Sequence, residues 1–282
     1  HEIYVNNYRI GFNPTMVTDT HLIFAISTNT PFYGSGPDVP NELRLVSPDG
    51  DFTMPLIVLP PAPVVETISN EFAKAGETLY VSGQYFYFLE GVEFPGGIVS
   101  TEVTANASGT ILQVVVPEGV EEAGSISVTT QSGSGVLSPK YRFNDFSGIF
   151  CDFDAKNPFT PWGPKPILGN SEPAPINGNY VRVTDVNTPA PMWWNNDQVI
   201  PLDGGIVWPV ITGNAADYAI KMEVRTPSAW KSGWFEINLG WTYFYRLKPW
   251  DVNPDPNEYW NVTGTNSPTP TDRWFTVVIP LN

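Results

Sequence analysis

The segment Gly76-Glu77-Thr78-Leu79-Tyr80-Val81-Ser82-Gly83 decides the fold, because it reads as a short strand between two glycines. It belongs to a unit that starts at Pro63-Val64-Val65, after the break Pro60-Pro61-Ala62-Pro63, and closes at Tyr141-Arg142-Phe143. Short strands spaced about 8–12 residues apart and joined by glycine and proline turns indicate a small β-sandwich.

An incomplete copy of this unit precedes it in the chain. Repetition at a spacing of about 90 residues indicates tandem domains. The first copy starts where the second is already halfway through, so we expect its early strands to be missing. The matching pairs are Leu22-Ile23-Phe24-Ala25-Ile26 with Leu112-Gln113-Val114-Val115-Val116, Ile3–Asn6 with Val92–Pro95, and Glu42-Leu43-Arg44-Leu45-Val46 with Ser125-Ile126-Ser127-Val128-Thr129.

The chain changes character from Asn144 onward. All ten tryptophans lie between Trp162 and Trp274, and residues 1–161 contain none. Tryptophan carries a large apolar surface and one donor, so it belongs in a core or against a ligand. We therefore expect a spacer that presents a binding module to flat, uncharged ligands such as sugars. Apolar strand contexts place three tryptophans in the core: Trp208, Trp241 and Trp274.

Composition limits the classes of function. Hydrophobic residues make up 41% of the 282 positions and charged residues 15%, which excludes a disordered chain. The net charge is −15, and the 14 lysines and arginines form no cluster. Nucleic acids, anionic polysaccharides and acidic membrane surfaces are therefore disfavoured, since each requires a basic face. No apolar run reaches the ~18 residues of a membrane-spanning helix, and no cofactor is indicated.

The predicted fold class is all-β. We expect a partial immunoglobulin-like sandwich at residues 1–60, a complete one at 61–143, and a larger jelly-roll-like antiparallel sandwich at 144–282. A closing strand is expected after Asn282. The strand candidates of the third part are Gly148–Phe153, Tyr180–Thr184, Gly205–Trp208, Tyr218–Thr226, Gly233–Tyr245 and Trp274–Pro280.

Gly233–Tyr245 is the longest predicted strand. Its alternation gives one apolar face, which reads as core, and a second face that carries Trp234, Glu236 and Asn238. An aromatic plane beside a carboxylate and an amide suits a sugar, whose ring C–H groups stack while its hydroxyls form hydrogen bonds. The alternative is that Trp234 covers an edge of the sandwich.

Trp230 and Trp250 are further candidate contacts in turns or loops, where binding residues are often placed. Trp193 and Trp194 are adjacent, so one of them is expected in the core if they lie on a strand, and both are exposed if they lie in a loop. Arg246 could donate bidentate hydrogen bonds to vicinal hydroxyls, or instead form a salt bridge with Glu223 or Asp251. The predicted ligand-binding residues are Trp193, Trp194, Trp230, Trp234, Glu236, Asn238, Arg246 and Trp250.

The single cysteine, Cys151, lies in an alternating segment and reads as a buried structural thiol. A catalytic thiol needs a histidine partner, and the only histidines, His1 and His21, lie in the distant N-terminal part. Two alternating carboxylates, Asp152 and Asp154, are only a weak signal for a structural Ca²⁺ site. The favoured interpretation is that both carboxylates are solvated at the edge of a strand. We predict no metal site.

These motifs carry two family resemblances. Residues 1–143 resemble the IPT/TIG immunoglobulin-like fold, most specifically at Pro63–Ser69 and Gly76–Gly83. Residues 144–282 resemble the C-terminal glycan-binding domain of surface glycan-binding proteins from polysaccharide utilization loci of Bacteroidetes. The motifs that carry the second resemblance are Asp152-Phe153-Asp154, Ile220-Lys221-Met222-Glu223-Val224, Tyr245-Arg246-Leu247-Lys248-Pro249-Trp250 and Trp274-Phe275-Thr276-Val277-Val278-Ile279-Pro280-Leu281.

The second resemblance implies a function. Such proteins are lipid-anchored on the cell surface and capture neutral glucans for an outer-membrane importer complex. We therefore expect a monomer that binds a neutral polysaccharide without catalysis, a β-glucan such as mixed-linkage glucan, xyloglucan or laminarin. The anchoring cysteine is expected upstream of His1. The aromatic binding face implied by the family makes Trp193, Trp194, Trp230 and Trp250 the closest positional candidates.

Two alternatives stay open at this point. A glycoside hydrolase on a jelly-roll fold needs two carboxylates on one face, and Glu223 with Glu236 is the pair that neighbouring strands would supply. The other alternative is an adhesive protein whose immunoglobulin-like repeats bind other proteins. Such a protein would not need aromatic residues concentrated in one part of the chain.

Overall fold

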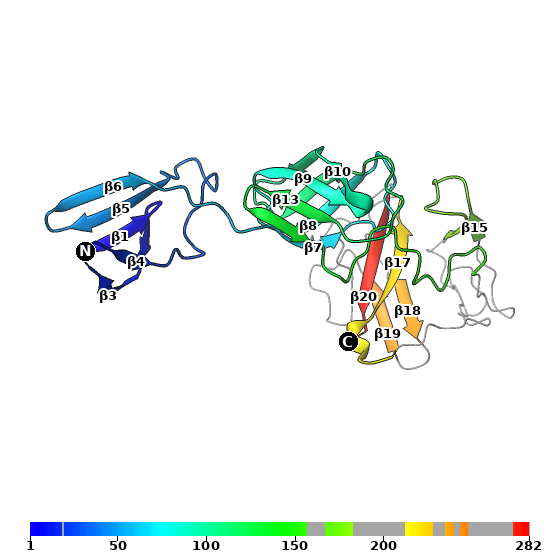
Figure 1. Cartoon of the computed structure of the whole chain (residues 1–282). Coiled ribbons are helices and arrows are strands. Elements are labelled where there is room, and N and C mark those ends of the chain that lie inside the picture. The colour runs from blue at the N-terminus through cyan, green and yellow to red at the C-terminus, as the bar shows by residue number, and fades with distance from the viewer. Residues whose placement is uncertain are drawn as a thin grey trace.

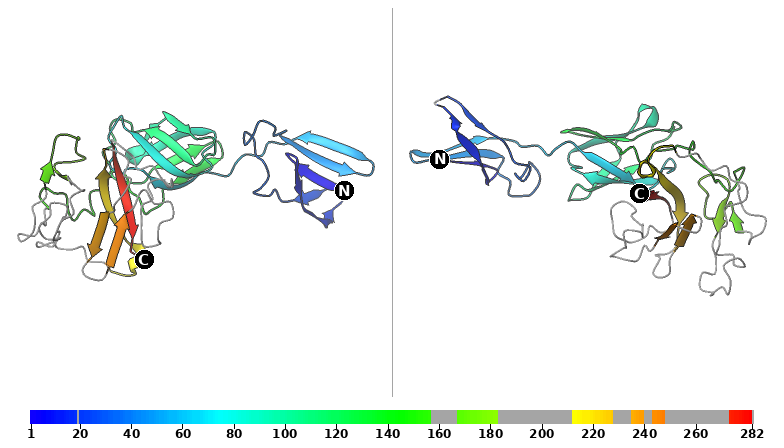
Figure 2. Two further views of the ribbon diagram at one scale, coloured as in Figure 1. Left: turned by 180° about the vertical axis from the view of Figure 1, so that it is seen from behind. Right: turned by 90° about the horizontal axis from the view of Figure 1, so that it is seen from below.

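The computed structural model describes residues 1–18, 20–156, 167–182, 212–227, 235–239, 243–247 and 273–281, with backbone alone for 167–168, 235–239 and 243–247. Its regular structure is β-strand apart from the short 3-10 turns η1 (Pro95–Gly97) and η3 (Ala215–Asp217), so the predicted all-β class is confirmed. The N-terminal region (residues 1–60), the middle region (61–143) and the C-terminal region (144–282) follow one another in space (Figures 1 and 2). No helix in the described part is long and apolar enough to span a membrane.

The middle region is a sandwich of two four-stranded antiparallel sheets. Their strand orders are β10-β9-β13-β14 and β11-β12-β8-β7. Leu79 and Val81, from the segment that decided the prediction, are fully buried between the sheets, as are Val92, Leu112 and Val128. The strands are β7 (Val64–Ile68), β8 (Thr78–Gln84), β9 (Leu89–Phe94), β10 (Ile98–Ser100), β11 (Val103–Ala105), β12 (Ile111–Val115), β13 (Ser127–Thr130) and β14 (Gly133–Val136).

The N-terminal region repeats one of these sheets. Its order, β2-β1-β5-β6, is that of β10-β9-β13-β14, and the pair β3-β4 corresponds to β11-β12. This arrangement bears out the internal repeat seen in the sequence. The strands are β1 (Glu2–Val5), β2 (Tyr8–Ile10), β3 (Phe12–Val17), β4 (Leu22–Phe24), β5 (Glu42–Ser47) and β6 (Gly50–Pro55).

Within the described residues of 1–60, β7 and β8 have no counterpart. Phe52 and Met54 lie opposite Leu45 and Leu43 in the sheet, yet they are 57% and 43% exposed. In the middle region, β7 runs beside β14 and covers the corresponding end of the sandwich. The apolar face of β6 is therefore left uncovered.

In the C-terminal region the described strands form three antiparallel pairs: β15 (Ile167–Gly169) with β16 (Tyr180–Arg182), β17 (Ala219–Arg225) with β20 (Trp274–Pro280), and β18 (Phe235–Leu239) with β19 (Tyr243–Leu247). On one face of β17–β20, the buried side chains of Phe275, Val277 and Ile279 pack against Val224, Met222 and Ile220. The strands predicted at Tyr218–Thr226 and Trp274–Pro280 are confirmed, and β16 supports the one at Tyr180–Thr184. Gly205–Trp208 lies outside the described residues.

Two strand predictions are wrong. Gly148–Phe153 is irregular, because the Asp152 side chain accepts hydrogen bonds from the backbone N–H groups of Asp154 and Lys156 and so holds a turn. Cys151 in this segment is only half-buried, and burial raises the pKa of its thiol.

Gly233–Tyr245 is not one strand, since β18 and β19 form a hairpin with Leu239 opposite Tyr243. Gly240, which lies in this connection, is the sequence signal for a reversal.

Candidate functional site

The β18–β19 hairpin brings three of the predicted ligand-binding residues to one face. Glu236 pairs with Arg246 in the antiparallel register, and Asn238 pairs with Phe244. Directly opposite residues share a sheet face, and so do positions two apart on one strand. A carboxylate, a guanidinium, an amide and an aromatic ring are thus assigned to the same face. Phe244 is an addition to the predicted set.

This register also changes the expected partner of Arg246. The sequence offered Glu223 or Asp251 as its salt-bridge partner, whereas the residue opposite it is Glu236. Glu223 lies on β17, in a different strand pair. The other predicted contacts lie outside the described residues: Trp193, Trp194, Trp230, Trp234 and Trp250. The same is true of the expected core residues Trp208 and Trp241.

Trp274 differs from its expected role as a core residue. It starts β20 and is only half-buried. Its indole Nε1 donates a hydrogen bond of 2.8 Å to the carbonyl of Ala174, and its ring packs edge-on against Tyr180 at 5.5 Å. Trp274 therefore ties β20 to the segment that leads into β16, which is a structural role at the margin of the core.

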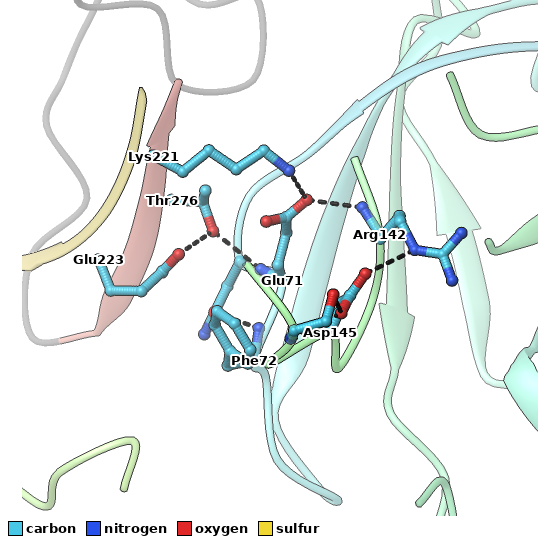
Figure 3. Close-up of polar contacts among 9 residues, drawn as sticks. Glu71, Phe72, Arg142, Asp145, Lys221, Glu223 and Thr276 are labelled. Carbon is cyan, nitrogen blue, oxygen red and sulfur yellow. Dashed lines mark hydrogen bonds and ion pairs between the residues drawn. The ribbon is translucent and has the colours of Figure 1, made fainter. Parts of the chain in front are cut away.

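The second face of β17–β20 docks on the middle region through a polar joint, drawn in Figure 3. Thr276 is 3% exposed, and its backbone N–H donates to the carbonyl of Ser69 at 2.8 Å. Its hydroxyl accepts a hydrogen bond of 2.9 Å from the backbone N–H of Glu71 and donates one of 2.7 Å to Oε1 of Glu223. One threonine thus connects both regions.

Glu71 is the centre of the joint on the middle region. Its side chain is 5% exposed, and Oε1 lies 2.6 Å from Nζ of Lys221 on β17. The same oxygen accepts a hydrogen bond of 2.6 Å from the backbone N–H of Arg142. Burial raises the pKa of the Glu71 carboxyl, and the hydrogen bond and charge of Lys221 act in the opposite direction.

Glu223 faces the same joint from β17. Although the residue as a whole is only half-buried, its Oε2 is shielded from solvent and has no hydrogen-bond partner among the described residues. Burial raises the pKa of this carboxyl to about 8; the Thr276 hydrogen bond lowers it, and the negative charge of Glu71 raises it further. Desolvation of the charged form is the dominant cause.

The joint removes Glu223 from the candidate catalytic pair with Glu236. A general acid must reach the proton acceptor of its substrate, whereas the carboxyl of Glu223 lies between β20 and the middle region. The docked face of β17–β20 is also closed to a polysaccharide. Sequence reasoning missed Glu71, Lys221 and Thr276 as joint residues. The sequence did contain a signal for a polar strand face, because Lys221 and Glu223 alternate with Ile220, Met222 and Val224. It contained no signal that the middle region covers this face.

Asp152 and Asp154 act in local structure. Asp152 holds the turn described above, and the Asp154 carboxylate accepts hydrogen bonds from the backbone and side-chain N–H groups of Asn179. No group of three metal-ligating side chains occurs in the part of the chain that the structure describes.

Comparison with known proteins assigns the C-terminal region. Residues 143–282 match the family model described as the surface glycan-binding protein B (SGBP-B) xyloglucan binding domain. This region is therefore similar to that domain family. With the two preceding immunoglobulin-like units, the chain is SGBP-B-like, as the sequence motifs indicated.

Two relatives agree with this assignment. An IPT/TIG domain-containing protein of Bacteroides ovatus is 26% identical over 191 residues, which cover 66% of this chain and 37% of the relative. The SGBP-B-like chain thus spans little more than a third of that protein. The crystal structure of the surface glycan-binding protein PbSGBP-B from Prevotella bryantii matches 99% of this chain and 76% of its own with a TM-score of 0.61 at 18% identity, which supports the fold. The matched family and this relative are named as glycan-binding proteins and not as hydrolases.

Proposed function

We propose that the C-terminal region binds a neutral β-glucan, with xyloglucan as the first candidate, and that it does so without cleaving it. The observation that carries the proposal is the match of residues 143–282 to a xyloglucan-binding-domain family. The scarcity of basic residues in an acidic chain agrees with an uncharged ligand.

The binding face we propose contains the β18–β19 hairpin and the tryptophan-rich segments of the C-terminal region. Glu236, Asn238 and Arg246 share one face of this hairpin by register, and their side chains supply acceptors and donors for sugar hydroxyls. In this proposal the stacking surfaces come from five tryptophans: Trp193, Trp194, Trp230, Trp234 and Trp250. By analogy with stacking of bases on aromatic side chains, one platform contributes roughly 1–3 kcal/mol. Such a face binds several consecutive sugars weakly, and many displayed copies raise the effective affinity.

The two immunoglobulin-like units act as a spacer in this proposal. The link between the N-terminal and middle regions is rich in proline at residues 60–63, which limits its flexibility. Aromatic contacts also join these regions, with Phe32 edge-on to Tyr87 at 4.9 Å and Tyr33 stacked on Phe88 at 5.4 Å. We infer that the full protein is an outer-membrane lipoprotein that holds the captured glucan at the cell surface and delivers it to an import complex.

Calorimetry against a panel of soluble glucans tests the proposal. Xyloglucan, mixed-linkage glucan and laminarin are compared with an anionic polysaccharide such as polygalacturonate, and heat of binding is expected for at least one neutral glucan and not for the anionic one. A reducing-sugar assay run in parallel is expected to give no release. Absence of binding to every neutral glucan contradicts the proposal, and turnover abolished by Glu236→Gln establishes the hydrolase alternative instead.

A further inference from the structure

The joint between β17–β20 and the middle region contains two carboxyl groups and a single cation bonded to one of them. Lys221 is bonded to Glu71 at 2.6 Å. Glu223 receives one hydrogen bond from the Thr276 hydroxyl, and its second oxygen, Oε2, is shielded from solvent without a donor in the described structure. A buried carboxylate requires donors at both oxygens or a paired charge. The surroundings of Glu223 therefore fit a neutral carboxylic acid.

We propose that Glu223 carries a proton in the docked protein, and that this proton is a condition for docking the glycan-binding region on the middle region. Two carboxyl groups beside one cation favour one charged and one neutral form. Glu71 takes the charge because it holds the ion pair with Lys221 and the N–H of Arg142. Glu223 takes the proton. The joint then fixes the direction in which the spacer presents the glycan-binding face.

Two arginines near the joint are engaged with other partners. Arg142 Nε is bonded to Asp145 at 2.7 Å, and the guanidinium of Arg273 lies over the ring of Tyr80 at 4.2 Å. Lys221 Nζ also lies 5.6 Å from the ring centre of Tyr141. The charged groups that act on Glu223 itself are Glu71, which raises its pKa, and Lys221, which lowers it.

The pH dependence follows from the direction of the shift. A carboxyl whose pKa is raised from 4.5 to about 8 holds its proton in the docked state over a range in which the free carboxyl has lost it. The contribution of Glu223 to docking is therefore fully present below about pH 4.5 and is lost as the pH rises toward 8, by about tenfold per pH unit. Between pH 6 and pH 8 the loss is on the order of 100-fold.

Urea unfolding followed by tryptophan fluorescence measures this effect, because every tryptophan lies at residue 162 or beyond and reports the C-terminal region alone. In the wild-type chain the urea midpoint is expected to be lower at pH 8 than at pH 6. Glu223→Gln, a neutral replacement, is expected to reduce this difference strongly and to raise the midpoint at pH 8. The matched control Glu102→Gln, at an exposed glutamate of the middle region, is expected to keep the wild-type pH dependence.

A second arm separates docking from the internal stability of the C-terminal region. Glu71→Ala, in a region without tryptophan, is expected to lower the midpoint of the tryptophan signal. The proposal is overturned if Glu223→Gln keeps the wild-type pH dependence, or if Glu71→Ala leaves the tryptophan transition unchanged. If the Glu223→Gln variant does not fold, the proposal is tested on the wild-type chain instead. The pH titration of its glutamate carboxyls is then followed by carbon-13 NMR. One glutamate titrating above pH 7 supports the proposal, and titration of all of them below pH 6 refutes it. None of these outcomes depends on a glycan.

Discussion

Nζ of Lys221 lies 2.6 Å from Oε1 of Glu71, a residue 150 positions earlier in the chain. The two side chains come from different regions, and their ion pair is shielded, with the glutamate 5% exposed and the lysine 31% exposed. This contact ties the C-terminal region to the middle region.

Removing the cation should therefore be costly. We expect Lys221→Met to lower the free energy of unfolding by about 3 kcal/mol, because it leaves a buried carboxylate without its counter-charge, while partial exposure of the lysine limits the loss. Urea unfolding followed by tryptophan fluorescence gives the value. Lys140→Met, at an exposed lysine of the middle region, serves as the control and should change stability by less than about 0.5 kcal/mol. Equal effects of the two variants would contradict the assignment.

Thr276→Val tests the shared hydroxyl of the joint. Valine keeps the shape but removes the acceptor for the Glu71 N–H and the donor to Glu223, so we expect a loss of about 2 kcal/mol from buried groups left unsatisfied. Thr104→Val, at an exposed position on β11, is the matched control and should be nearly neutral. A Thr276→Val chain as stable as the control would show that the two hydrogen bonds contribute nothing.

The tryptophans divide into two groups with opposite expected phenotypes. Trp193→Ala or Trp250→Ala should weaken glucan binding tenfold or more, roughly the loss of one stacking contact, without unfolding the region. Trp274→Phe should instead lower stability by about 1 kcal/mol, since it loses the hydrogen bond to Ala174 and keeps an aromatic ring beside Tyr180, and it should leave affinity unchanged. Calorimetry and thermal unfolding of the same samples separate the two. Unchanged affinity in both alanine variants would remove this site assignment.

Glu236 and Arg246 should behave as a coupled pair. As direct partners across β18–β19, they are expected to show a coupling energy of about 0.2–1 kcal/mol in a double-mutant cycle of Glu236→Gln and Arg246→Met on glucan affinity. Glu223→Gln with Arg246→Met is the comparison cycle and should be additive, because Glu223 lies in a different strand pair. Additivity in the first cycle would mean that the two residues act separately on the ligand.

Alternation within short segments was sufficient to predict several elements. Leu79 and Val81 are buried where the segment between two glycines placed them, and Trp274–Pro280 forms a strand over the predicted span. The repeat of Ile3–Asn6 and Val92–Pro95 is reproduced by β1 and β9, which hold the same position in their sheets. Local interactions also explain the failures. The Asp152 side chain captures backbone donors within four residues, and β18 and β19 pair as two antiparallel strands inside what read as one strand.

The sequence by itself determined the all-β class, the tandem repeat and the concentration of tryptophan in the C-terminal region, because periodicity and composition are local properties of the chain. Only the tertiary structure decided that Glu236 faces Arg246 and that Glu71, Lys221, Glu223 and Thr276 meet in one buried joint. The pattern of a strand shows that it has a polar face, but it carries no information about which distant segment covers that face. The energies of buried charges depend on that segment, so the protonation of Glu223 is a property of the assembled fold.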